Sequence, residues 1–314
     1  MFDPATAPER RRAPLGPVVA LAAYLLLCPA ILVLAPLLGL LLLSRPTTGR
    51  EWWWTFGIIA WLGLVFAQAG GIATQIVLAW GVFLAGAFVA IQVWRPRPWL
   101  PAAIAGTALA LGAVTAMGRL VGIGWSEIRL AVIHDGWELC RQLLDEDGIG
   151  TRLSPERTAA LRTYVDAFSD SVGLVAALYP ALLALAGVLG IGMAWRWYHR
   201  IALRPIGPMP TAFAAFRFND QLIWGVVAVA LLLVLPLPEP SRVVGANLAL
   251  FLGGLYAARG AAVAWATASA IPAGFLLALL IGLLFLFPLA LGGLVSLGLA
   301  DTWIDFRRRP APSH

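Results

Sequence analysis

Apolar stretches about as long as a lipid bilayer is thick follow one another along most of this chain. Residues 21–43 and 271–300 contain no charged side chain at all. Hydrocarbon offers no partner to an exposed backbone group, so a charge-free apolar run of about eighteen residues or more is typical of a membrane-spanning helix. With 61% hydrophobic and 12% charged residues, the chain is predicted to be an all-α, polytopic transmembrane helix bundle.

About eight spans are expected, at residues 18–43, 53–68, 72–94, 99–121, 172–195, 222–235, 243–268 and 272–300. Proline removes a helical hydrogen bond and crowds the preceding turn. Because Pro29 and Pro36 interrupt the first stretch and Pro288 the last, each of these is either one kinked span or a pair of half-spans.

Between the two membrane halves, residues 17–121 and 172–306, lies a polar insertion at residues 122–171. Polar tails flank the halves at residues 1–16 and 307–314, the second of them basic. Apolar residues recur in the insertion at steps of three and four, which predicts two amphipathic helices. Such helices lie on the membrane surface or dock a partner, and their modest apolar faces favour the surface.

Tryptophan and glycine mark span ends and helix contacts. Trp52, Trp53 and Trp54 lie at the start of the second span, where indole anchors a helix in the headgroup layer; a tryptophan cage for a ligand is the alternative. Gly187, Gly190 and Gly192 lie in the fifth span without a preceding nucleotide-binding strand. They predict close helix packing rather than cofactor binding.

All 22 basic residues are arginine. The absence of lysine excludes Schiff-base chemistry and a P-loop. The net charge of +6 resides largely beside spans, where arginine meets anionic lipid, so no nucleic-acid partner is predicted. The arginines next to spans, Arg217 among them, favour the cytoplasmic side for those connections and the opposite side for the insertion.

Arg259 is the one charge well inside a predicted span. A buried guanidinium is costly unless it is paired, hydrated or able to reach the interface. It therefore binds a ligand anion, pairs with Asp301, or extends to the headgroup layer. Asn247 on the same helix, with Gln68, Gln75 and Gln92 on earlier spans, either bonds neighbouring helices or lines a substrate path.

Catalytic signatures are missing. There is no HExxH motif and no mid-membrane aspartate pair, and the serines lack a nearby base. His134, Asp135 and Glu138 lie close together on a helix, but such a set usually forms a solvated face. We therefore predict no enzyme activity, no cofactor and no metal. The lack of a buried carboxylate in any span also disfavours autonomous proton coupling.

The C-terminal third resembles the YybS-like family of uncharacterised bacterial membrane proteins, on residues 216–222, 247–262 and 297–307. The resemblance implies a multi-pass protein of the bacterial inner (plasma) membrane. It also implies a distant likeness to the substrate-binding components of energy-coupling-factor transporters and to the cell-shape protein MreD. In the polar ending, Asp301 and Asp305 share a helix face, and the basic tail begins at Arg307.

The expected function is recognition of a small molecule, as the substrate-binding part of a transporter that a partner protein energises. The alternative is a membrane scaffold in envelope assembly or cell-shape determination. Besides the lipid bilayer, the expected partners are a membrane protein and a small-molecule ligand. A recognition protein needs a polar-lined cavity with Arg259, Asn247 or the glutamines pointing into it. A scaffold needs a docking face, for which the helices around Trp137 are the candidates.

Overall fold

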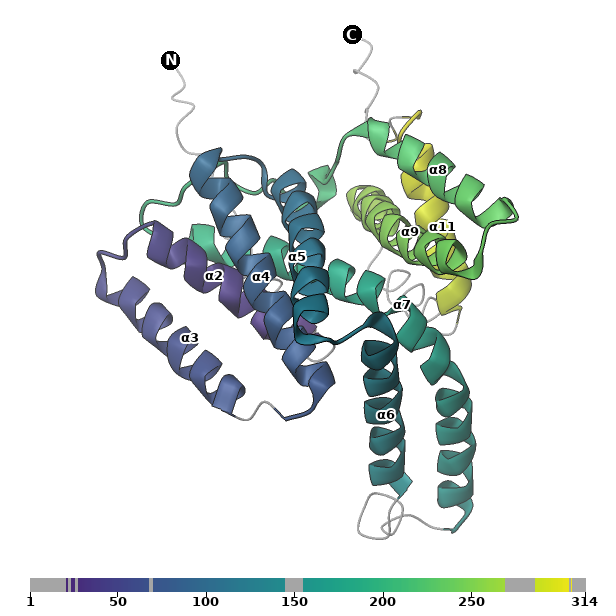
Figure 1. Ribbon diagram of the computed structural model, residues 1–314. Coiled ribbons are helices and arrows are strands. Elements are labelled where there is room, and N and C mark those ends of the chain that lie inside the picture. The colour runs from purple at the N-terminus through teal and green to yellow at the C-terminus, as the bar shows by residue number, and fades with distance from the viewer. Residues whose placement is uncertain are drawn as a thin grey trace.

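The computed structural model describes residues 21, 24–25, 28–67, 70–144, 155–268, 286–304 and 306 (Figure 1). Throughout these residues the regular structure is helical, with no strand. The α-helices are α2 (Ile31–Leu43), α3 (Gly49–Ala67), α4 (Ile72–Trp94), α5 (Trp99–Val121), α6 (Trp125–Leu144), α7 (Pro155–Ile201), α8 (Ile223–Val234), α9 (Glu239–Ala268) and α11 (Phe287–Ala300). Two short 3-10 turns, η2 (Phe213–Ala215) and η3 (Asp220–Leu222), precede α8.

Four helical segments are long and apolar enough to cross a membrane: Ile72–Trp94, Trp99–Val121, Ser171–Ile201 and Glu239–Thr267. The first two coincide with predicted spans, and the other two contain a predicted span or most of it. The helical membrane-protein class is therefore supported, whereas the expected number of eight spans is not confirmed.

The other predicted spans correspond to shorter or more polar helices in the described residues; residues 18–20, 22–23 and 26–27 of the first predicted span and 272–285 of the last lie outside them. α2, α8 and α11 have 13, 12 and 14 residues. At about 1.5 Å per residue they are roughly 20 Å long, against a hydrocarbon core of about 30 Å. α3 has 19 residues but includes Arg50 and Glu51 in its first turn. Helix α2 begins two residues after Pro29, and Pro288 lies in the first turn of α11, so these two prolines accompany helix starts, whereas Pro36 lies inside α2.

The insertion differs from the predicted pair of separate surface helices. Its second helix is the beginning of α7, which runs for 47 residues from Pro155 through Ser171 into the span. Helix α6 packs beside this part of α7, and together they project from the rest of the molecule (Figure 1). The second helix of the insertion is therefore continuous with a span, and the expectation that the two helices lie on the membrane surface stays a prediction.

A core forms where α2 packs against α3, α4 and α7. Small residues allow these helices to approach closely. A Cβ atom at Gly187 would come within 2.5 Å of the Leu84 side chain on α4, and one at Gly190 within 2.6 Å of the Leu32 carbonyl oxygen on α2. The predicted packing role of the α7 glycines is thus confirmed.

Connections that carry arginine meet at one end of the bundle. The Arg50 guanidinium at the start of α3 donates to the carbonyl oxygens of Arg200 and Ile201 at the end of α7, at 3.0 and 2.9 Å. Trp99, which follows the turn with Arg95 and Arg97, lies 6.1 Å from Phe216 between ring centroids. The connections before α3, before α5 and after α7 are therefore neighbours in space.

Candidate functional site

Arg259 lies about two thirds of the way along α9 and is 2% exposed. Its Nε donates to Asp301 Oδ2 at 2.8 Å, and one terminal nitrogen donates to the Asp301 backbone oxygen at 2.9 Å. Asp301, which is 3% exposed, caps the C-terminal end of α11. A cation suits this position because the last carbonyls of a helix carry partial negative charge.

The other terminal nitrogen of Arg259 donates to Asp220 Oδ1 at 2.7 Å. Asp220 opens the short η3 turn, which the Asn219 side chain caps by accepting from the Gln221 backbone N–H at 3.0 Å. The Asp220 side chain remains 62% exposed, so the buried cation is linked to the molecular surface through this carboxylate. Sequence reasoning missed Asp220, although it belongs to one of the stretches of family resemblance.

One aromatic ring and a second arginine complete what we call the Arg259 cluster: Arg259, Asp301, Asp220, Phe218 and Arg217. The Arg259 Cζ atom is 5.3 Å from the centre of the Phe218 ring. Nη2 of the half-exposed Arg217 is 4.0 Å from Asp301 Oδ1. With two cations and two carboxylates, the cluster is formally neutral.

Close helix contact makes this pairing possible. Gly260 and Gly298 face each other where α9 meets α11, and an added Cβ atom on either would collide with the backbone of the other helix. Because neither glycine carries a side chain, α9 and α11 approach each other closely enough for Asp301 to reach Arg259. Acids of the chain itself surround the Arg259 guanidinium, so the geometry supports the interpretation in which Arg259 pairs with Asp301.

Asn247 bonds backbone rather than facing an open path. Its Nδ2 donates to the carbonyl oxygens of Ala177 and Val243, both at 2.9 Å, and its Oδ1 accepts from the Ala181 N–H at 3.0 Å. Ala177 and Ala181 flank Pro180 inside α7, where the missing proline N–H leaves the helical ladder incomplete. The amide therefore joins α9 to the proline site of α7.

The glutamines on the earlier predicted spans also bond backbone. Gln92 is 1% exposed, and its side chain both donates to Arg97 O at 3.1 Å and accepts from Arg97 N at 3.0 Å, which closes the turn before α5. Gln75 Nε2 donates to Gly70 O at 3.3 Å. Gln68 lies outside the described residues.

The predicted interfacial tryptophans lie on the outside of α3. Trp52, Trp53 and Trp54 are 41%, 80% and 40% exposed. Trp53 and Trp54 border a groove that also includes Trp61 and Arg50. The remaining predicted topology residues, Asp305 and Arg307, are outside the part of the chain that the structure describes.

Glu51 is a buried carboxylate that sequence reasoning did not single out. It is 3% exposed; Oε1 accepts from the Leu203 N–H at 2.7 Å, and Oε2 from the Thr47 and Thr48 N–H groups at 2.8 and 2.9 Å. These hydrogen bonds, Leu203 first, lower the pKa of Glu51 to about 2, against the opposing effect of burial. The signal in the sequence is Thr48 three residues before Glu51, the spacing of a capping box.

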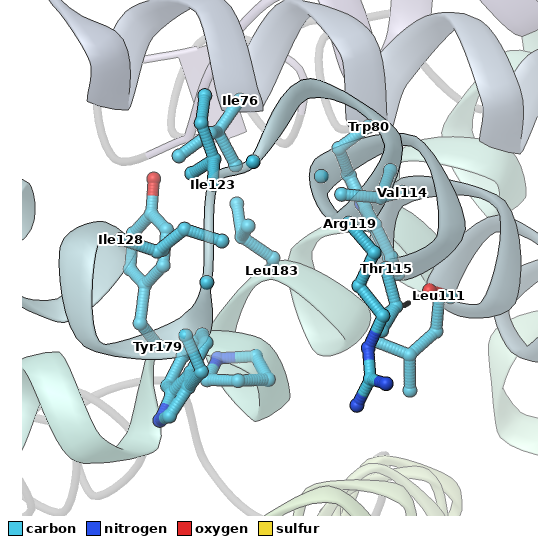
Figure 2. A pocket seen from close by; sticks show the side chains of 15 residues that line it. Ile76, Trp80, Leu111, Val114, Thr115, Arg119, Ile123, Ile128, Tyr179 and Leu183 are labelled. Carbon is cyan, nitrogen blue, oxygen red and sulfur yellow. Dashed lines mark hydrogen bonds between the residues drawn. The ribbon is translucent and has the colours of Figure 1, made fainter.

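A cavity of about 500 Å³ lies between α4, α5, α7 and the start of α6 (Figure 2). Figure 2 shows Arg119, Thr115 and Leu111 along one wall, with Ile128 and Tyr179 opposite. Pro180, beside the Asn247 contact, also lines it. The cavity is mostly apolar, and its described lining includes none of Arg259, Asn247, Gln75 and Gln92.

Metal chemistry has no visible basis in the described residues. Within them, no group of three or more His, Cys, Asp and Glu side chains is placed to hold a metal ion. His134 Nδ1 and Asp135 Oδ1 are 3.7 Å apart, with exposed side chains, and form a surface pair.

The chain matches no protein-family model, and comparison with curated proteins and with solved structures gives no match either. The resemblance to the YybS-like family therefore stays a prediction, and the geometry of the protein itself carries the functional argument.

Proposed function

We propose that this protein is an integral membrane protein that recognises a small molecule in the cavity between α4, α5, α6 and α7. In this proposal it is the non-enzymatic, substrate-recognising component of a transporter energised by a partner, in the inner membrane of a bacterium. The observation that carries the proposal is the cavity of about 500 Å³, because ligand sites of this kind measure about 300–1,000 Å³ and are lined mainly by apolar side chains.

The position of the cavity suits a recognition role. It adjoins Pro180, where α7 contains a break in its hydrogen-bond ladder and receives the Asn247 side chain from α9. A ligand that contacts the neighbouring Tyr179 or Leu183 thus touches a helix that can change its bend at a proline. Binding would be linked in this way to the relative position of α7 and α9.

The distribution of acids supports energisation by a partner. The four segments long enough to cross a membrane contain one carboxylate, Glu239, at the first residue of its segment. A proton-coupled transporter commonly needs a titrating acid in the middle of a span. In the described spans no such group exists, so the driving force would come from another protein.

The test is purification in a mild non-ionic detergent followed by native mass spectrometry. Val114→Trp would fill the cavity, and Leu109→Trp on the same helix is the matched control, because Leu109 is 59% exposed and does not line it. We expect a co-purifying small molecule on the wild type and on Leu109→Trp, and its loss from Val114→Trp. Equal occupancy of all three proteins, or none in the wild type, would contradict the proposal.

A scaffold role is the second candidate, and the projecting pair of α6 and the first part of α7 favours it. Trp137 on α6 is 46% exposed, so this projecting pair presents a large aromatic side chain that another protein can contact. The same purification separates the two roles. An empty cavity together with a stoichiometric envelope protein, lost on Trp137→Ala, would favour the scaffold.

A further inference from the structure

We propose that the ligand of the cavity is a single-chain amphiphile with an anionic head group. The head group lies at Arg119, and the chain extends toward Trp80 and Leu183. This inference rests on the proposed function, since it names the class of molecule that the same cavity accepts.

The residues that line the cavity are exposed at one of its ends and buried at the other. Arg119, Thr115 and Leu111 on α5 are exposed, whereas Trp80 on α4 is 2% exposed and Leu183 on α7 is 8% exposed. The cavity therefore leads from the surface near the end of α5 inward to apolar side chains. A ligand that fits must be polar at one end and apolar at the other.

Arg119 is the charged group in the lining, and the Glu127 carboxylate next to the lining accepts from the Gly124 N–H instead of pairing with Arg119. No carboxylate pairs with it and no hydrogen bond involves its guanidinium, as far as the described residues go. Its position in the last turn of α5 is favourable for a cation but does not neutralise it. Arg259 provides the contrast, because two acids of the chain occupy its donors. Arg119 is thus available to an anion.

The head group is expected to determine selectivity. In a membrane, an alkyl chain is already surrounded by hydrocarbon, so its transfer into an apolar cavity adds little binding free energy. A carboxylate or phosphate that meets a guanidinium next to a low-dielectric cavity gains a charge-assisted hydrogen bond. The volume of about 500 Å³, in the lower half of the usual range, suits one chain better than the two chains of a membrane phospholipid.

The experiment titrates the purified full-length protein, in a non-ionic detergent, with palmitate and separately with hexadecanol, which has an equally long chain and no charge. Binding is measured by native mass spectrometry for the wild type, Arg119→Gln, Arg129→Gln, Val114→Trp and Leu109→Trp. Arg129 is the matched control for charge, because it is exposed on α6 and does not line the cavity.

We expect palmitate to bind the wild type, Arg129→Gln and Leu109→Trp alike, and about tenfold more weakly to Arg119→Gln. Val114→Trp should lose palmitate, and hexadecanol should bind the wild type no better than palmitate binds Arg119→Gln. Equal loss in Arg119→Gln and Arg129→Gln would overturn the inference, because it would show a general effect of surface charge.

Two further outcomes separate this inference from the proposed function. If palmitate and hexadecanol bind equally and Val114→Trp removes both, the cavity is a ligand site but the anionic head group is wrong. If neither compound binds the wild type while another small molecule is lost from Val114→Trp, the amphiphile is wrong and the recognition role stands. Arg119→Gln changes an exposed side chain, so it keeps the test decisive even if Val114→Trp fails to fold.

Discussion

At the scale of single residues, the buried polar side chains described above mostly bond to other groups of the chain. Arg259 meets two carboxylates, Glu51 three backbone N–H groups, and Gln92 both backbone groups of Arg97. Such groups are costly inside a membrane protein unless they are paired. Their first role is therefore to fix tertiary contacts, and a ligand has to be sought elsewhere.

The Arg259 cluster should respond strongly to loss of charge. Arg259→Gln and Asp301→Asn are each expected to destabilise the protein by about 3–5 kcal/mol, because either removes one partner of a buried ion pair. Asp220→Asn should lower the stability by a smaller amount, since that side chain is 62% exposed. The measurement is thermal unfolding in detergent, with Arg242→Gln on the exposed start of α9 as control.

Exchanging the charges gives a sharper test of the same cluster. In Arg259→Asp/Asp301→Arg the new acid at position 259 would face Asp220, so the exchange should restore only part of the lost stability. Adding Asp220→Asn should restore more, because it removes the repulsion. Equal stability of the single, double and triple variants would show that these charges do not interact.

Because the pKa of Glu51 is lowered in the folded protein, we predict that the free energy of unfolding depends on pH. Its pKa is lowered to about 2 in the folded protein, so ionised Glu51 stabilises the fold above about pH 4.5, and this contribution is lost as the pH falls toward about 2. Glu51→Gln should destabilise by about 1.5–3 kcal/mol at neutral pH, because an amide NH₂ would oppose backbone donors. The difference between wild type and variant should shrink on acidification, whereas Glu239→Gln, an exposed control, should show no such trend.

At the scale of elements, α7 is the helix that organises the molecule. It packs against α2, α5, α6 and α9, and it changes direction along its length (Figure 1). Pro180 lies inside it, and proline is a common cause of such a bend. Asn247 bonds the backbone on both sides of this proline, so a residue on one helix stabilises the shape of another.

The Asn247 contact can be tested by a double-mutant cycle. Asn247→Leu should lower stability by about 0.6–1.7 kcal/mol, the range for hydrogen bonds between helices in membrane proteins. When Pro180 is replaced by alanine, α7 can form its own backbone hydrogen bonds at this place. In that background Asn247→Leu should lower the free energy of unfolding by a smaller amount. Unfolding temperatures of the wild type, the two single variants and the double variant give the coupling energy between Asn247 and Pro180. Additive effects would mean that Asn247 does not act through the proline site.

At the scale of the whole molecule, the arginine-bearing connections before α3, before α5 and after α7 lie at one end, and the loop between α5 and α6 lies at the other end of α5. The preference of arginine for the cytoplasmic side then predicts an orientation. It places the start of α6 on the opposite, outer side of the membrane.

Cysteine labelling checks this orientation. With Cys28 and Cys140 replaced by serine, Ser126→Cys at the start of α6 should react with an impermeant maleimide in spheroplasts. Arg204→Cys after α7 should react only after permeabilisation. The reverse pattern would invert the topology, and equal labelling of both would place the two positions on one side.

Local sequence pattern was enough to predict the helical class, the exact bounds of α4 and α5, and the packing role of the α7 glycines. Hydropathy and the need to satisfy backbone groups in lipid act within one segment, so they can be read from the segment alone. The pairing of Arg259 with Asp301 could be proposed because few carboxylates were available to a charge inside a span.

Tertiary structure decided the rest. Asp220, Leu203 and Ala181 reach their partners Arg259, Glu51 and Asn247 only because distant segments pack together, and no local pattern encodes such a distance. The packing of α6 beside the first part of α7 is likewise a contact between separate helices. The cavity exists because four segments meet without filling the space between them, which is a property of packing and not of any one stretch of sequence.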